Sequence, residues 1–283
     1  MKLQTVVDIA PSNRKIGYED RILMLGSCFS DAIGQIMAEH YLPVTCNPFG
    51  TLYNPLSIAQ ALTFQISPSN FQFHDGLWHS MAHHGSFSRA TKEEAEAAVR
   101  ASIETMRKAL EEATVVIVTF GTAWVYEFSP MNGQPSVVVG NCHKLPETCF
   151  TRRRLGVDEI VAAWRPILDK YPDKHWLFTV SPIRHIKDGL HENQLSKATL
   201  LLAIEQLINN RQSSNRQYFP SYEILLDELR DYRFYADDLV HPSSMAVNYI
   251  WERFVDCFCT LQTRNELVLQ HKRWKHEHHI PLH

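Results

Sequence analysis

Residues 21–30 read RILMLGSCFS, a short apolar run that stops at a glycine and passes into a polar turn. After it, Ile33, Ile36, Met37 and Tyr41 recur at the spacing of one helix face. The stretch therefore predicts a strand, a tight turn and a helix, which is the repeating unit of an α/β fold.

Further strands and helices follow the same alternation. Residues 114–120 (TVVIVTF) are β-branched at most positions and apolar on both parities, as a strand covered on both faces must be. Two similar strands are predicted at 176–180 and 222–226. Helices are predicted at 57–66, 157–170, 192–210 and 244–262, and after the capping box that begins at Thr91. The alternation predicts an α/β fold, a three-layer αβα sandwich around a mostly parallel sheet.

The whole chain of 283 residues is predicted to form one domain, because no internal repeat or low-complexity linker divides it. Two segments, near 67–90 and near 126–150, are too polar and irregular for the core and are predicted to be insertions. Residues 264–283 are predicted to form a polar C-terminal tail.

The composition excludes several classes of protein. With 45% hydrophobic and 21% charged residues, the chain is neither disordered nor fibrous. A formal net charge of −3 disfavours nucleic acid as a partner. No apolar run reaches the roughly 18 residues of a membrane span, and charge interrupts the first residues before a signal-peptide core can form. We therefore expect a cytoplasmic protein with no membrane partner.

Six cysteines and fifteen histidines are the residues that would indicate disulfide or metal chemistry. The cysteines form no CxxC pair and lie mostly in apolar or motif-like segments, which is typical of free thiols. The histidines show none of the ordered spacings of a zinc site. We expect no disulfide framework, no metal and no other cofactor.

Ligands of an open parallel sheet bind at the carboxyl ends of its strands, so the residues that follow each apolar run carry the functional prediction. Five segments lie in such connections: 26–30 (GSCFS), 47–54 (NPFGTLYN), 121–124 (GTAW), 181–185 (SPIRH) and 237–243 (DDLVHPS).

Four motifs, taken together, resemble those of a known family. Residues 26–30 (GSCFS), 47–51 (NPFGT), 141–144 (NCHK) and 238–243 (DLVHPS) closely resemble the GSCFA family, which is named for its first motif. That family is similar to the SGNH/GDSL hydrolases. The resemblance covers about residues 21 to 260, and it implies an SGNH-like fold and an ester hydrolase.

The resemblance implies a catalytic triad of Ser27, His241 and Asp238. A serine at a strand-to-helix turn lies beside the helix N-terminus, where negative charge is stabilised. It needs an imidazole as base and a carboxylate that orients the imidazole, and the Asp-x-x-His spacing brings Asp238 and His241 together in one turn. The alternative is that Ser27 and Asp238 are only helix caps. Cys28 is a rival nucleophile, although the residue after a nucleophile normally packs beneath the helix.

The oxyanion hole implied by the resemblance consists of the Ser27 N–H, the Gly50 N–H and an asparagine side chain. The third motif departs from this pattern, because residues 121–124 read GTAW and contain no asparagine. Gly121 and Thr122 are the replacements, through a backbone N–H or the Thr122 hydroxyl, and Asn47 and Asn54 also remain open. Gly121 has the alternative role of a strand-ending turn.

Substrate binding is predicted for Asn47, His143, Arg184 and His185. The last two follow a predicted strand and can face the cleft, where they would bind an anionic or hydroxyl-rich substrate. Arg184 could equally pair with a surface carboxylate.

The sequence thus predicts a serine hydrolase that removes a small acyl group, such as acetyl, from a carbohydrate or metabolite ester. An acyltransferase with the same triad is one alternative. A ligand-binding module without activity is the other, and the altered third motif supports it. The oligomeric state stays open.

Overall fold

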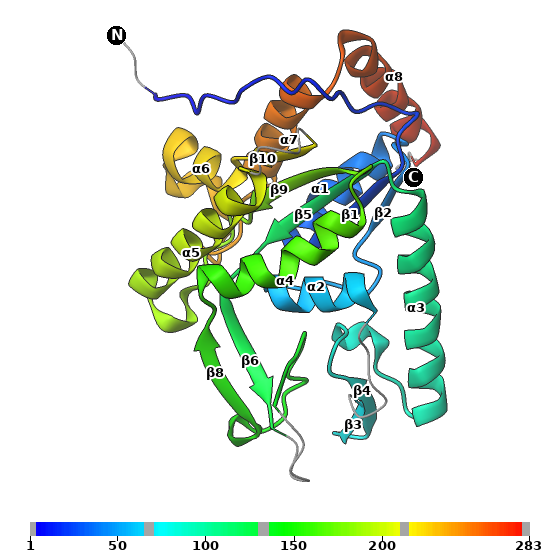
Figure 1. The fold of residues 1–283 in the computed structure, drawn as a ribbon. Helices are drawn as coiled ribbons and strands as arrows, with labels where there is room; N and C mark the ends of the chain where they lie inside the picture. The colour runs from blue at the N-terminus through cyan, green and yellow to red at the C-terminus, as the bar shows by residue number, and fades with distance from the viewer. Residues whose placement is uncertain (1–3, 65–70, 130–135, 210–214, 279–283) are drawn as a thin grey trace, which may run out of the picture.

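The computed structural model describes residues 4–64, 71–129, 136–209 and 215–278 (Figure 1). In these residues a five-stranded sheet has the order β10-β9-β5-β1-β2, and every neighbouring pair is parallel. The strands are β1 (Ile22–Gly26), β2 (Val44–Cys46), β5 (Val115–Phe120), β9 (His175–Val180) and β10 (Arg216–Phe219). The predicted α/β class is confirmed.

Side chains of the central strands alternate between two hydrophobic cores. Leu23 and Leu25 of β1 belong to one core, whereas Ile22 and Met24 belong to the other. Because every residue of β1, β5 and β9 is buried, these strands read as mostly apolar runs in the sequence, with Thr119, His175 and Thr179 as buried polar exceptions.

Helices cover both faces of the sheet, which confirms the three layers. The first core packs against α2 (Pro55–Thr63), α3 (Lys92–Glu112), α4 (Val157–Lys170) and α5 (Leu190–Ile208). The second packs against α1 (Cys28–Glu39), α7 (Ser244–Phe258) and α8 (Leu261–Glu277). In Figure 1, α4 lies in front of the sheet and α1 behind it.

The strand predicted at 222–226 is wrong. These residues are helical, in α6 (Ser221–Glu223) and the π-helix η5 (Ile224–Leu229), and the strand of this region is β10, a few residues earlier. A short apolar run does not distinguish a strand from a buried helix. Pro220 directly precedes α6, a position where proline is compatible with the start of a helix.

Both predicted insertions have secondary structure, and in Figure 1 they project from the same end of the molecule. The first contains a hairpin of β3 (Phe71–His74) and β4 (Leu77–Ser80), and residues 67–70 lie outside the described part. The second contributes to an antiparallel sheet of β6 (Trp124–Phe128), β7 (Val137–Val138) and β8 (Phe150–Arg154), and residues 130–135 lie outside the described part.

The segment predicted as a polar tail forms most of helix α8, while residues 279–283 lie outside the described part. Leu267 of this helix is buried and belongs to the second core, so the helix packs on that core through this apolar side chain. Among the described residues, no helix has the length and apolarity that crossing a membrane requires.

Candidate active site

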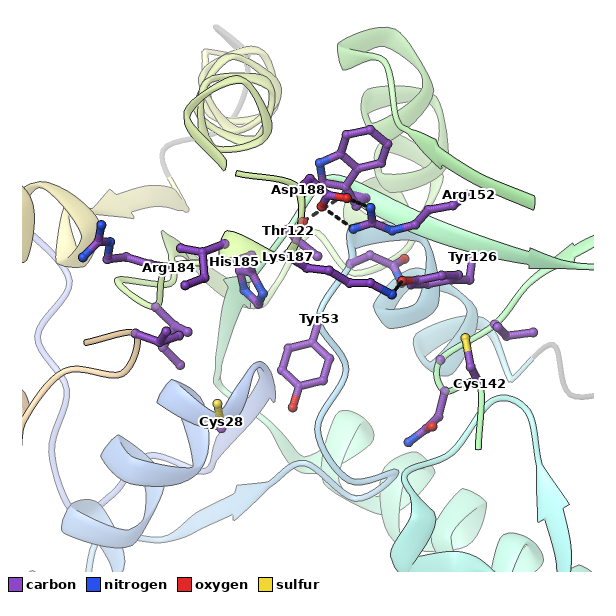
Figure 2. A pocket seen from close by; sticks show the side chains of 18 of the residues that line it. Cys28, Tyr53, Thr122, Tyr126, Cys142, Arg152, Arg184, His185, Lys187 and Asp188 are labelled. Carbon is purple, nitrogen blue, oxygen red and sulfur yellow. Dashed lines mark hydrogen bonds and ion pairs between the residues drawn. The ribbon is translucent and has the colours of Figure 1, made fainter. Parts of the chain in front are cut away.

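The ends of β1, β5 and β9 meet at one edge of the sheet. Gly26 of β1 pairs with Thr119 of β5, which pairs in turn with Thr179 of β9. The connections that follow these strands, together with the small antiparallel sheet, enclose a cavity of about 490 Å³ (Figure 2). Its lining includes Cys28, Tyr53, Asn54, Thr122, Trp124, Tyr126, Asn141, Cys142, Arg152, Arg184, His185, Lys187, Asp188 and His241.

Ser27 is fully buried and lies outside the cavity lining. It is the N-cap of α1, and its Oγ accepts a hydrogen bond from the Phe29 N–H at 3.3 Å. The same hydroxyl donates to Oγ of Ser181 at 3.0 Å. In this position the Ser27 hydroxyl is held beneath the surface as a cap, so attack on a substrate would require it to leave both hydrogen bonds. Its role as nucleophile stays a prediction.

Cys28, the first residue of α1, does line the cavity. Figure 2 shows its sulfur projecting from the helix toward the space between Tyr53 and His185. Burial raises the pKa of the Cys28 thiol, although the N–H groups of Cys28 and Phe29 act in the opposite direction. The sulfur is therefore a protonated thiol at neutral pH, placed at a helix N-terminus and facing the cavity.

Asp238 and His241 form the predicted pair. Oδ2 of Asp238 lies 2.6 Å from Nδ1 of His241, and Oδ1 accepts the N–H groups of Val240 and His241, both at 2.9 Å. These bonds, the backbone ones first, lower the pKa of Asp238 to about 2. His241 lines the cavity, so an imidazole oriented by a carboxylate is available there.

His185 follows β9 and lines the cavity beside Tyr53. The two rings are arranged edge to face, with their centres 6.0 Å apart. Its Nε2 is buried and has no hydrogen-bond partner among the described residues. Burial, and then the charges of Lys197 and His241, lower the pKa of His185 to about 3. His185 is therefore a neutral imidazole at physiological pH, with one ring nitrogen unsatisfied.

Three of the predicted oxyanion donors, the amides of Gly50, Gly121 and Thr122, are engaged elsewhere. The Gly50 N–H donates to the Asn47 carbonyl at 2.7 Å, and the N–H groups of Gly121 and Thr122 donate to the Tyr53 carbonyl at 2.8 and 2.9 Å. The Thr122 hydroxyl lines the cavity but lies 3.1 Å from Oγ of Ser196. Gly50 and Gly121 do not fit the role because their amides stabilise the connecting loops.

Gly50 is required for a different reason. Its φ of +76° lies in the left-handed region, and a Cβ there would stand 2.2 Å from Cβ of His84. The glycine thus permits the close approach of the loop 47–54 to the first insertion.

Of the four predicted substrate-binding residues, Arg184 and His185 line the cavity and Asn47 and His143 do not. Asn47 accepts the Gly26 N–H at 2.8 Å and donates to Asp31 at 2.6 Å, so it ties the end of β1 to the next loop. His143 lies 2.8 Å from the Ser80 carbonyl, on the hairpin side. Both have structural roles because their polar atoms are consumed by neighbouring protein groups.

Arg184 has no ion-pair partner among the described residues, in contrast to the alternative of a surface carboxylate. It donates to the Leu239 carbonyl at 3.1 Å, and its guanidinium lies 5.3 Å from the centre of the Tyr235 ring. These contacts attach the end of β9 to the loop that carries His241.

Lys197 was not predicted and is fully buried beneath the site. Its Nζ donates to the carbonyls of Gly121 and Ser181, both at 2.7 Å, and so joins the segments after β5 and β9. Burial lowers the pKa of Lys197 to about 7. The sequence did contain a signal for this residue: Lys197 lies on the buried face of the predicted helix 192–210, where the residue is normally apolar.

No group of three or more His, Cys, Asp or Glu side chains that could hold one metal ion occurs in the described part of the chain. The cavity offers the thiols of Cys28 and Cys142, the imidazole of His241 bonded to Asp238, and the neutral imidazole of His185.

Comparison with known proteins identifies one relationship. The model of the GSCFA family matches residues 21–254, which is most of the chain. A search of curated proteins finds no match.

Proposed function

The chain belongs to the GSCFA family, and from that premise we propose that it hydrolyses a small acyl ester through a covalent intermediate on Cys28. One observation carries the proposal: Cys28 and His241 line the same cavity, whereas Ser27, the buried N-cap of α1, lies outside its lining. The proposal keeps the expected acyl chemistry and replaces the serine by the neighbouring thiol.

The first half-reaction forms a thioester. His241 uses its Nε2 as general base, because Nδ1 is bonded to Asp238. As the Cys28 sulfur attacks the ester carbonyl carbon, the thiol proton passes to His241. The tetrahedral intermediate then expels the alcohol, which takes that proton from His241, and leaves the acyl group on Cys28. Asp238 orients the imidazole and stabilises its charged form.

In the second half-reaction a water molecule replaces the alcohol. His241 accepts a proton from the water as its oxygen attacks the thioester carbon. The intermediate then expels the Cys28 thiolate, which regains its proton from His241, and the carboxylic acid is released. Over the whole cycle, one water molecule and one ester give one alcohol and one carboxylic acid.

The negative charge on the carbonyl oxygen needs donors other than the amides of Gly50, Gly121 and Thr122, which are engaged in loop contacts. The Cys28 N–H is in the first turn of α1, where amides have no intrahelical acceptor. His185 lines the cavity, and its unpartnered Nε2 is the second donor once the ring turns this buried nitrogen toward the oxygen, as the tautomer that carries its proton there. A neutral imidazole can serve as such a donor, since it need not first lose a charge.

The substrate in this proposal is an ester of a small molecule or carbohydrate, with a small acyl group such as acetyl. A cytoplasmic location is part of the proposal, because the nucleophile must be a reduced thiol.

The test is to trap the intermediate. The protein is mixed with para-nitrophenyl acetate, quenched in acid within the first turnovers, digested and analysed by mass spectrometry. We expect acetyl on the peptide that contains Cys28, removable by hydroxylamine at neutral pH as a thioester is. Acetyl on Ser27 would restore the serine mechanism, and no acetyl together with no release of nitrophenol would refute hydrolysis.

A further inference from the structure

The cavity has a second end, opposite Cys28, built by the small antiparallel sheet and the short helix η4 (Ile186–Asp188) (Figure 2). Tyr126 of β6 stands directly opposite Arg152 of β8 in the sheet register. We refer to Trp124, Tyr126, Arg152, Lys187 and Asp188, which line this end, as the distal end.

Arg152 is held rigidly at the distal end. Its guanidinium forms an ion pair with the Asp188 carboxylate and lies 4.6 Å from the centre of the Trp124 ring. Both members of the ion pair are mostly buried, with side-chain exposures of 25% and 18%. The carboxylate of Asp188 therefore already balances the charge of Arg152.

Positive charge is in excess in the cavity. Arg152, Arg184 and Lys187 line it, whereas Asp188 is the one carboxylate among the lining residues. Lys187 donates to the Tyr126 hydroxyl at 3.0 Å and lies 3.5 Å from Glu147. Since Lys187 and Glu147 are exposed to 63% and 92%, their ion pair is weak and leaves the ammonium available.

Two buried donors at the distal end are unsatisfied. Nε1 of Trp124 and Nε of Arg152 have no hydrogen-bond partner among the described residues. An unsatisfied buried donor is costly, and because these two nitrogens have no exposed surface, acceptor oxygens of a ligand remove that cost once the side chains turn toward the cavity. By contrast, the guanidinium of the neighbouring Arg153 is paired with two carboxylates, those of Glu127 at 2.7 Å and Glu159 at 2.6 Å.

We propose that the distal end binds an anionic, oxygen-bearing group of the substrate, either a carboxylate or a phosphate. The excess of cations attracts the anion, and the unsatisfied donors need oxygen acceptors. The rings of Tyr126 and Trp124 flank the apolar or ring-shaped part of the substrate that joins the anion to the ester. This inference rests on the proposed function for its position relative to the reacting carbon. The preferred substrate is then an acyl ester that also carries an anion.

The kinetic test compares three acetyl esters that share one leaving group framework: para-acetoxybenzoate, para-acetoxyphenyl phosphate and the neutral methyl para-acetoxybenzoate. We expect at least one anionic ester to have the lower KM. Lys187→Gln should raise that KM about fivefold, as expected for a partly exposed charge, and leave the KM of the neutral ester unchanged. The control, Arg154→Gln, removes the same charge from an arginine outside the cavity that pairs with Glu192.

A binding measurement separates this inference from the proposed function. Isothermal titration gives the Kd of para-hydroxybenzoate, para-hydroxyphenyl phosphate and the neutral methyl para-hydroxybenzoate, without any turnover. Tighter binding of an anion that Lys187→Gln weakens and Arg154→Gln does not would support the distal site, even if no ester were cleaved. Equal binding of all three, or an equal loss in both variants, would overturn it whatever the esterase activity.

Discussion

At one end of the cavity Cys28, His185 and His241 stand on segments fixed by the parallel sheet, whereas at the other end Trp124, Tyr126 and Arg152 belong to a separate antiparallel sheet. The first end has the Cys28 thiol and the imidazoles of His185 and His241. The second has cations and aromatic rings. Chemistry needs fixed geometry, while recognition needs complementary charge and shape. In the proposed function, catalysis and substrate selection therefore belong to different parts of the fold.

The largest effect should distinguish the two cysteines of the cavity. Cys28→Ala should lower kcat by about four orders of magnitude or more, because removing a covalent nucleophile leaves only binding and electrostatic effects. Cys142→Ala, at the other end, should leave kcat nearly unchanged. Initial rates with para-nitrophenyl acetate measure both. A loss confined to Cys142→Ala would reverse the assignment of the two ends.

The next largest effect concerns the base. His241→Ala should lower kcat by roughly 10²–10⁴-fold, the usual contribution of a general base, and Asp238→Asn should cost less because the imidazole remains. Far-ultraviolet circular dichroism checks that both variants fold. His143→Ala is the control, since His143 lies outside the cavity lining. Wild-type turnover by a folded His241→Ala protein would exclude the proposed base.

An intermediate effect is the pH dependence of Cys28 alkylation. The thiolate is the reactive form, and burial raises the pKa of Cys28, so its fraction should keep rising through the alkaline range. Mass spectrometry should therefore find slower labelling by iodoacetamide at neutral pH than in the protein unfolded in urea. Fast labelling of Cys28 that is constant across neutral pH would instead show a preformed thiolate.

The smallest effect is expected at Ser27. Ser27→Ala should lower the free energy of unfolding by about 1 kcal/mol, the typical value of a lost helix cap, and change kcat only a few-fold. Urea unfolding measures the stability. Ser243→Ala, which removes the N-cap of α7, is a matched control for a cap outside the cavity lining. If Ser27→Ala folded and lost activity as Cys28→Ala does, the serine would be part of the chemistry.

From the sequence, Ser27 could be only a helix cap, and Cys28 could be the nucleophile in its place. The sequence excluded neither possibility. Adjacent residues at a helix start differ by about 100° around the axis, so one of them faces the cavity and the other does not. Which one does so depends on how α1 packs on the sheet. The strand predicted at 222–226 has a similar origin, because a five-residue apolar run fits a buried helix equally well.

Local patterns determined what the sequence alone could establish: the β-branched runs of the buried strands, the capping box at Thr91 and the Asp238–His241 pair, whose partners are three residues apart. Tertiary structure decided the rest. The Tyr53 carbonyl occupies the amides of Gly121 and Thr122, Lys197 holds carbonyls from two other segments, and Tyr126 meets Arg152 across the insertion. Contacts within one turn are set by backbone geometry, whereas contacts between distant segments exist only once the sheet and its helices have packed.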